Sequence, residues 1–208
     1  MINGYIKISE GHIYQDKITG ETPVYSREYS ELTYDKYQTT QQMSKLRFEI
    51  AKKFFRFNSI LDFGYGNGSF LNICNENGIE CYGYDISDYP LKPGIVRAIT
   101  YGIEVDLITF FDSIEHLQER NLEDFLAGLY TNQILISVPW YHHIGDDWFF
   151  RWKHRRENEH FHHFSPSGLA TIMERAGFTP IWHGNPEDEI RRPTSDLPNI
   201  LTMAGIKF

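Results

Sequence analysis

The sequence is poor in cysteine and contains no long hydrophobic run. Its two cysteines, Cys74 and Cys81, are too few and too unsuitably spaced for a disulfide framework or a zinc ribbon. No apolar stretch approaches the roughly 18–20 residues that a membrane helix needs. The first residues, MINGYIKISEG, lack the basic and apolar regions of a signal peptide. These absences predict a protein of the reducing cytoplasm without a membrane segment.

The chain also lacks an excess of positive charge. Its formal net charge is −8, which disfavours broad electrostatic binding to nucleic acid. One local exception is the run RWKHRR at Arg151–Arg156, which is either a solvated loop or a patch that receives an anionic substrate. With 208 residues, of which 41% are hydrophobic, the chain has the length and composition of one domain with its own core. The pattern does not indicate an oligomeric state.

Strand and helix signals alternate along most of the chain. Strands are expected at 59–64, 79–86, 105–112 and 133–139, and helices at 35–57, 68–77, 121–130 and 165–177. Two further strands, 178–184 and 199–208, follow one another without a helix between them. This order predicts an α/β fold in which helices cover both faces of a mostly parallel sheet that has one antiparallel strand at the C-terminal end.

The first 34 residues do not follow this alternation. They combine short alternating runs with a turn signal at Thr19–Gly20, which predicts an N-terminal arm or small hairpin (1–34) in front of the main domain (35–208). Tyr29, Tyr34 and Tyr37 are spaced so that they either cover a binding cleft or pack on the edge of the sheet.

Three glycines stand at alternate positions in the stretch ILDFGYGNGSFL (60–71), directly after an expected buried strand. A glycine-rich turn between a strand and a helix is a common cradle for nucleotide-like ligands. The dinucleotide-binding pattern Gly-x-Gly-x-x-Gly does not fit, because Ser69 and Leu71 stand where its last glycine belongs. The observed pattern, Asp62-x-Gly64-x-Gly66-x-Gly68, resembles motif I of the class I S-adenosylmethionine-dependent methyltransferases.

This resemblance implies a Rossmann-like, doubly wound sheet of seven strands and S-adenosylmethionine as the cofactor. It also implies that the glycine-loop backbone borders the methionine part of the cofactor and that Asp62 orders the loop. A second feature agrees with it: Asp85 ends the next strand, where its carboxylate can accept both hydrogen bonds of a ribose diol.

Three further residues are implied as cofactor contacts. Ile86 and Phe111, just past strand ends, would sandwich the adenine. Arg47, on the helix before the loop, resembles a basic residue that meets the cofactor carboxylate in some quinone O-methyltransferases, although an ordinary surface arginine is an equal alternative. The sequence departs from the family pattern between Asp85 and Asp106, where there is no room for a full helix and a long third strand.

The stretch FDSIEHL (111–117) carries a second resemblance. Asp112, Glu115 and His116 resemble the acid-x-x-Glu-His pattern of quinone O-methyltransferases and of small-RNA 2′-O-methyltransferases, in which these residues can bind a divalent ion. Mg²⁺ or Mn²⁺ suits such ligands. Six of the nine histidines lie between 142 and 163, and His160 approximately matches a further ligand of the RNA enzymes. The alternative is that Glu115 and His116 only begin a helix and that His116 acts as a base.

The sequence therefore predicts a methyltransferase that modifies the oxygen of a small molecule or a sugar. His116 and His160 are the candidate catalytic residues, either as bases or as ligands of an ion that acidifies the acceptor hydroxyl. One alternative is an RNA 2′-O-methyltransferase, which RWKHRR supports and the net charge opposes. Another is a module that binds the cofactor without catalysis. A nicotinamide-dependent oxidoreductase is disfavoured by the glycine spacing.

Overall fold

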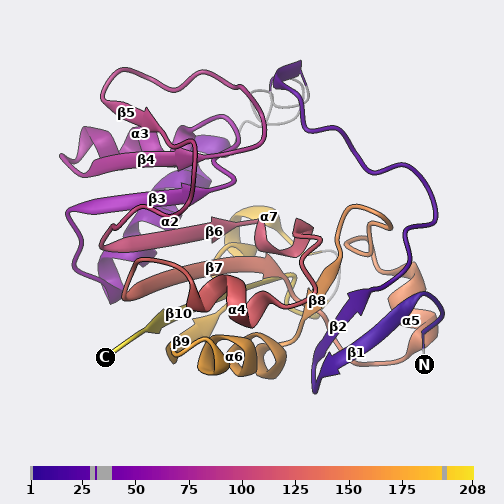
Figure 1. Ribbon diagram of the computed structural model, residues 1–208. Coiled ribbons are helices and arrows are strands. Elements are labelled where there is room, and N and C mark those ends of the chain that lie inside the picture. Colours follow the sequence, from indigo (N-terminus) through magenta and orange to yellow (C-terminus); the bar gives the residue numbers. More distant parts are fainter. Residues whose placement is uncertain (1, 29–30, 32–38, 194–195) are drawn as a thin grey trace.

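The structure, a computed structural model, describes residues 2–28, 31, 39–193 and 196–208. Its centre is a seven-stranded sheet with the strand order β5-β4-β3-β6-β7-β10-β9 (Figure 1). The strands are β3 (Ser59–Phe63), β4 (Glu80–Tyr84), β5 (Ile95–Arg97), β6 (Leu107–Phe111), β7 (Gln133–Pro139), β9 (Thr179–Gly184) and β10 (Ile200–Ile206). The six predicted strands, which correspond to β3, β4, β6, β7, β9 and β10, are confirmed to within a few residues, whereas β5 was not predicted.

The last strand gives the sheet its mixed character. β10 lies between β7 and β9 and is antiparallel to both, while β5, β4, β3, β6 and β7 are parallel to one another. The predicted Rossmann-like sheet with an inserted antiparallel strand is confirmed. Since the parallel strands all end at the same edge, the loops that follow β3, β4, β6 and β7 meet there.

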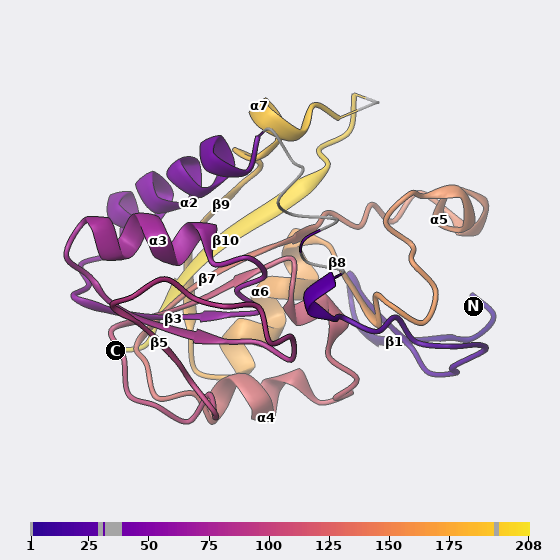
Figure 2. The same cartoon turned by 90° about the horizontal axis from the view of Figure 1, so that it is seen from above.

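Helices cover both faces of the sheet (Figure 2). On one face α2 (Thr40–Phe54) and α3 (Ser69–Glu76) bury a cluster that includes Phe48, Phe70 and Leu71; on the other, α4 (Leu122–Ala127) and α6 (Pro166–Arg175) cover Leu126, Leu169 and the central strands. The first turn of α6 is fixed by the Ser165 hydroxyl, which accepts a hydrogen bond from the backbone N–H of Gly168. No helix within the described residues is both long and apolar enough to cross a membrane.

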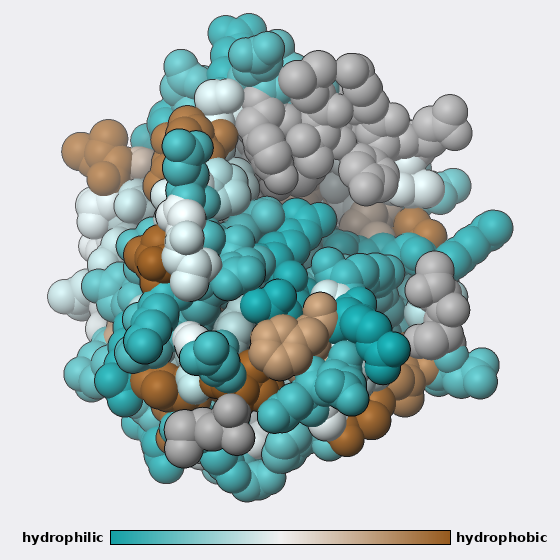
Figure 3. Space-filling model, turned by 90° about the vertical axis from the view of Figure 1, so that its right-hand side faces the viewer, coloured by the Kyte–Doolittle hydropathy of each residue, from teal (hydrophilic) through white to brown (hydrophobic). Residues whose placement is uncertain are grey.

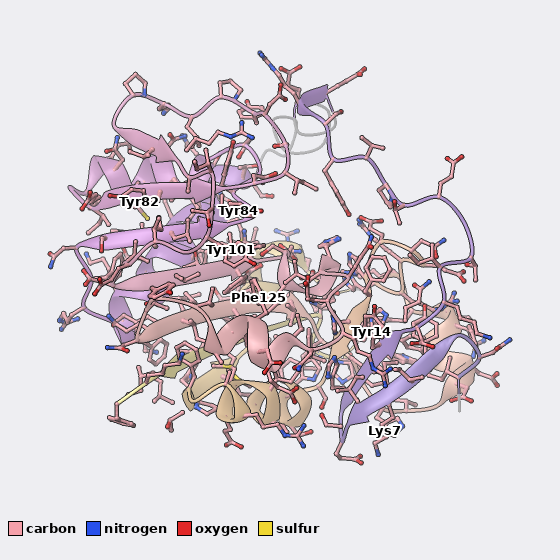
Figure 4. All side chains as sticks on the ribbon, in the orientation of Figure 1. Lys7, Tyr14, Tyr82, Tyr84, Tyr101 and Phe125 are labelled. Atoms are coloured by element: carbon pink, nitrogen blue, oxygen red, sulfur yellow. The ribbon has the colours of Figure 1, made fainter. Side chains whose placement is uncertain are left out.

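The connection between β4 and β6 contains only the short strand β5, as the spacing predicted. Aromatic rings cover the sheet there instead of a helix. The rings of Tyr84 and Tyr101 meet edge to face at 5.5 Å between centroids, and Tyr101 meets Phe125 of α4 in the same way at 5.3 Å. Figure 4 shows these three side chains gathered over neighbouring strands.

The N-terminal segment forms the hairpin β1 (Tyr5–Ser9) and β2 (His12–Gln15). Its turn lies at Glu10–Gly11 and not at Thr19–Gly20, because the two strands that pair, of five and four residues, both precede that turn signal. β2 also pairs with β8 (His162–Phe164), so the hairpin shares a three-stranded sheet with the histidine-rich segment beyond the carboxyl ends of the parallel strands (Figure 1). Tyr34 and Tyr37, like Tyr29, lie outside the described residues.

Two short helices were not expected. α5 (Asp146–Arg151) places Phe149 among the rings of Tyr5 and Tyr141, and α7 (Asp188–Arg191) follows β9. They contain only 6 and 4 residues and lie in segments where no helix was predicted.

Buried histidines join the hairpin to β8. His162 Nε2 donates to the carbonyl oxygen of Glu119 at 2.9 Å, which leaves Nδ1 of His162 to accept from His12 Nε2, also at 2.9 Å. His163 packs against the rings of Tyr5 and Phe149. Burial lowers the pKa of His12 to about 2, that of His163 to about 3 and that of His162 to about 4.

We expect acid to destabilise the fold through these histidines. Their folded pKa values lie below the value of about 6.5 of an exposed histidine, so the unfolded chain binds more protons and stability falls as the pH drops below 6.5. Each should contribute a loss of about 2 kcal/mol between pH 6.5 and pH 5. Denaturant unfolding of the wild type, His163→Phe and the exposed control His143→Phe should show a shallower pH dependence only for His163→Phe. Equal slopes in all three proteins would contradict this origin of acid sensitivity.

Candidate active site

The glycine loop leads from the carboxyl end of β3 into α3. Gly64, Gly66 and Gly68 all have positive φ, at 80°, 57° and 71°. The loop is tied at its start, where the N–H of Gly64 donates to the carbonyl oxygen of Tyr84 at 2.7 Å. A side chain at Gly64 would place its Cβ 2.6 Å from Cβ of Ser113, so glycine is required there both by conformation and by space.

The two predicted acids differ in their relation to this loop: Asp62 precedes it on β3, and Asp85 bonds to it from the end of β4. Asp62 is buried on β3 and accepts a hydrogen bond from the Thr109 hydroxyl of β6 at 2.7 Å. Burial raises the pKa of Asp62 to about 7, although the hydrogen bond from Thr109 opposes this shift. Asp85 follows β4, and its carboxylate accepts from the backbone N–H groups of Gly66 at 2.9 Å and Ser87 at 2.7 Å. Asp85 therefore sets the distance between the glycine loop and the β4 end.

The other predicted cofactor contacts differ in exposure. Ile86 is 74% exposed directly after Asp85, whereas Phe111 is buried against Phe70, with ring centroids 4.9 Å apart. The guanidinium carbon of Arg47 lies 4.4 Å from the centre of the Phe111 ring. Arg47 and Phe111 thus form a cation–π pair at the carboxyl end of β6.

Arg47 belongs to a partly buried ionic network, here called the arginine clamp: Arg47, Asp112, Glu187 and Arg191. Arg47 donates to Glu187 Oε1 and to Asp112 Oδ2, both at 2.8 Å, and Arg191 donates to the same Asp112 oxygen and pairs with Glu187 at 3.0 Å. Burial alone would raise the pKa of Asp112, but Arg191 and Arg47 hold it below its usual range. Asp112 is therefore a carboxylate already neutralised by arginines.

Three of the four predicted metal ligands come together next to this clamp. Glu115, His116 and His160 each offer a ligand atom, and these atoms lie within 4.8 Å of one another. The backbone N–H of Phe161 donates to the carbonyl oxygen of Glu115 at 2.8 Å, which fixes His160 beside the β6 loop. Asp112 is not a member of this group, because its carboxylate is bound in the arginine clamp.

The polar atoms of this group have few protein partners. Both carboxylate oxygens of Glu115 and Nδ1 of His160 are buried without a hydrogen bond among the described residues. Burial, followed by the charge of Asp112, raises the pKa of Glu115 well above its usual value, and burial lowers the pKa of both His116 and His160. A carboxyl group and two neutral imidazoles in this arrangement fit a divalent cation, which would supply the missing partners.

One residue that the sequence reasoning missed reaches the group from the N-terminal side. Residues 16–28, here called the strap, run from β2 past the carboxyl edge of the sheet (Figure 1). The phenol oxygen of Tyr25 lies 2.8 Å from Nδ1 of His116. Beside this contact is a shallow depression of about 530 Å³ between Gln118 and strap residues including Ile18 and Val24. Figure 3 shows that hydrophilic residues dominate the centre of this face. An isolated tyrosine in an irregular segment gives no sequence signal of such a contact.

Comparisons with known proteins agree with this geometry. A family model described as a methyltransferase domain matches residues 34–183. A SAM-dependent methyltransferase from Archaeoglobus fulgidus superposes with a TM-score of 0.65 at 19% identity, over 86% of this chain and 100% of the other. Comparison with curated protein sequences gives no match.

Two solved enzymes with bound S-adenosylhomocysteine are also similar. The 1,6-didemethyltoxoflavin-N1-methyltransferase of Burkholderia thailandensis has a TM-score of 0.61 and 14% identity, with 98% of this chain and 99% of that enzyme covered. The magnesium protoporphyrin IX methyltransferase of Synechocystis PCC 6803 has a TM-score of 0.57 and 13% identity, with 92% and 91% covered. At these identities the likeness concerns the fold.

The close approach of Ser113 to Gly64 predicts that a side chain at Gly64 destabilises the protein, and Gly78 provides a matched control. Gly64 and Gly78 have nearly equal φ, 80° and 78°, but no atom lies within 4 Å of a Cβ built at Gly78. Gly78→Ala should lose about 1–2 kcal/mol of folding free energy from conformation alone. Gly64→Ala should lose about 1–3 kcal/mol more from the contact with Ser113. Urea unfolding measures both, and equal losses would show that Ser113 does not constrain the loop.

Proposed function

We propose that this chain, which belongs to the methyltransferase domain family, transfers the methyl group of S-adenosylmethionine to a hydroxyl group of a small molecule. Membership of the class I S-adenosylmethionine-dependent methyltransferases rests on the family match and the fold. The observation that carries the proposed acceptor chemistry is the placement of Glu115, His116 and His160 at the same sheet edge as the glycine loop.

The proposed cofactor contacts follow from the loop geometry. Each carboxylate oxygen of Asp85 accepts one backbone hydrogen bond and retains a second acceptor position, so the side chain can still accept the two hydroxyls of a ribose. Ile86, exposed beside it, offers an apolar face for the adenine. The three loop positions adopt positive φ, which favours glycine, and because glycine has no side chain the backbone there can approach the methionine part closely.

The proposed cation site has a different ligand set from the one that the sequence indicated. With Asp112 held by two arginines, the set is one carboxylate and two imidazoles. Imidazole ligands favour Mn²⁺ and other transition metals over Mg²⁺, which prefers oxygen ligands and water. A bound divalent cation would lower the pKa of an acceptor hydroxyl and fix its direction. If no cation binds, the same two imidazoles remain as the candidate bases for the hydroxyl proton.

The surroundings of the site favour a small acceptor over RNA. In the run RWKHRR, Arg155 pairs with Glu157 at 3.3 Å and Arg156 with Glu159 at 2.8 Å, so these two charges are balanced by acids. The net charge of −8 opposes phosphate binding as well. Gln118, which lines the depression, is two residues from His116 in the sequence. Ile18 and Val24 also line it and offer apolar contacts. Two structurally similar enzymes are named for small-molecule substrates.

The cofactor proposal is tested by calorimetry with S-adenosylhomocysteine and S-adenosylmethionine. Asp85→Ala should weaken both about tenfold or more, because it removes the ribose acceptor, a loss of about 1.5–3 kcal/mol for hydrogen bonds to a charged group. Asp88→Ala, an exposed acid three residues further on, should bind like the wild type. A wild type that binds NAD and neither sulfur compound would refute the cofactor assignment.

The cation proposal is tested by titrating Mn²⁺ and following its paramagnetic resonance signal. The wild type should bind one Mn²⁺, and Glu115→Gln should reduce its affinity at least tenfold while leaving S-adenosylhomocysteine binding intact, since the glycine loop and Asp85 are separate from this group. Glu119→Gln, an exposed acid on the same loop, serves as the control. Catalysis without any bound cation would leave His116 and His160 as bases only.

A further inference from the structure

Along its second half, the strap turns inward at Tyr25. All of residues 16–28 are exposed except Tyr25, which is half-buried. The strap is anchored near its start, where the backbone N–H of Thr19 donates to Asn158 Oδ1 at 3.0 Å and its hydroxyl to Glu157 at 2.9 Å. Among these mostly exposed residues, the side chain that turns inward is the one that meets His116.

The contact with His116 is specific in geometry. The Tyr25 phenol oxygen lies 2.8 Å from Nδ1, and the two rings meet edge to face at 5.5 Å and 85°. Because Nδ1 is engaged by the phenol, the remaining nitrogen, Nε2, is the one that faces the cation group, 4.0 Å from Glu115 Oε1. A neutral imidazole carries one proton, so whichever role the phenol takes at Nδ1 decides whether Nε2 has a lone pair or a hydrogen.

We propose that Tyr25 is a positioning residue for His116: its phenol oxygen accepts the Nδ1 hydrogen and thereby holds the lone pair of Nε2 toward Glu115 and His160. This inference rests on the proposed cation site. Ligating histidines generally donate their second ring N–H to an outer partner, which fixes both tautomer and ring orientation. In the rival arrangement the phenol donates to Nδ1, and the hydrogen of the neutral imidazole stands on Nε2. In that tautomer His116 cannot bind a cation through Nε2.

The strap would therefore complete the cation site from outside the sheet. Val24, next to Tyr25, and Gln118, two residues after His116, line the depression on this face. A small-molecule acceptor that displaces the strap would disturb the tautomer, whereas one that fits beneath it would leave the site intact.

The test compares Tyr25→Phe with Tyr14→Phe. Phenylalanine at 25 keeps the ring and its edge contact but removes the oxygen. Tyr14 lies on β2, and its hydroxyl donates to the backbone carbonyl of Gln118 at 2.8 Å without touching His116, so it reports the loss of a hydroxyl alone (Figure 4). Tyr25→Phe should weaken Mn²⁺ binding about 10–100-fold with unchanged affinity for S-adenosylhomocysteine. Tyr14→Phe should leave both affinities unchanged.

The tautomer is read separately, without metal, by ¹⁵N correlation spectroscopy of the imidazoles, with His116→Gln used for assignment. The wild type should show the hydrogen on Nδ1 of His116, and Tyr25→Phe should shift the population toward Nε2–H. Equal Mn²⁺ affinity in the wild type and Tyr25→Phe, or an Nε2–H tautomer in the wild type, would overturn the role of Tyr25 alone. A wild type that binds S-adenosylhomocysteine but no Mn²⁺ would overturn the cation site together with this role, and one that binds neither would refute the proposed function itself.

Discussion

The arginine clamp is the interaction on which the geometry of the site depends. Arg47 comes from α2, Asp112 follows β6, and Glu187 and Arg191 belong to the segment at α7. Two positive and two negative groups balance, and Glu187 is fully buried. Such a network adds little net stability, but removal of one arginine would leave the buried Glu187 carboxylate less well compensated. The clamp therefore acts mainly by specifying where the loop after β6 must lie.

The fixed position of the loop after β6 determines whether Asp112 or Glu115 is available to the proposed cation site. Asp112 has a φ of 53°, and its backbone N–H donates to Ser137 of β7, so its side chain turns to the arginines as the chain leaves the sheet. Glu115, three residues later, is then buried beside His116 and His160 without a cationic side chain bonded to it among the described residues. The charge of Asp112 also raises the pKa of Glu115. Within four residues, the clamp thus separates a carboxylate that is bound by arginines from the carboxylate of the proposed cation site.

Local patterns predicted the sheet and the glycine loop well, because their signals lie within a few neighbouring residues. Alternation of strands and helices gave the parallel order, and the glycines from Gly64 to Gly68 marked the loop that positive φ requires. The pairing of β2 with β8 was not predictable in this way, since it joins residues 150 positions apart, as in the contact between His12 and His162. The same holds for Tyr25 and His116, which are 91 positions apart.

The pattern of Asp112, Glu115 and His116 likewise could not be interpreted fully from its own neighbourhood in the sequence. The spacing Asp112-x-x-Glu115-His116 is compatible with a site that uses both acids or only one, because a turn can direct either side chain toward the imidazoles. The choice is made by Arg47 and Arg191, which lie 65 and 79 positions from Asp112 and carry no signal of that pairing in their own neighbourhoods. The sequence of such a loop therefore gives the residue types, whereas the ligand set of the proposed cation site follows only once the arginines that compete for its carboxylates have been located.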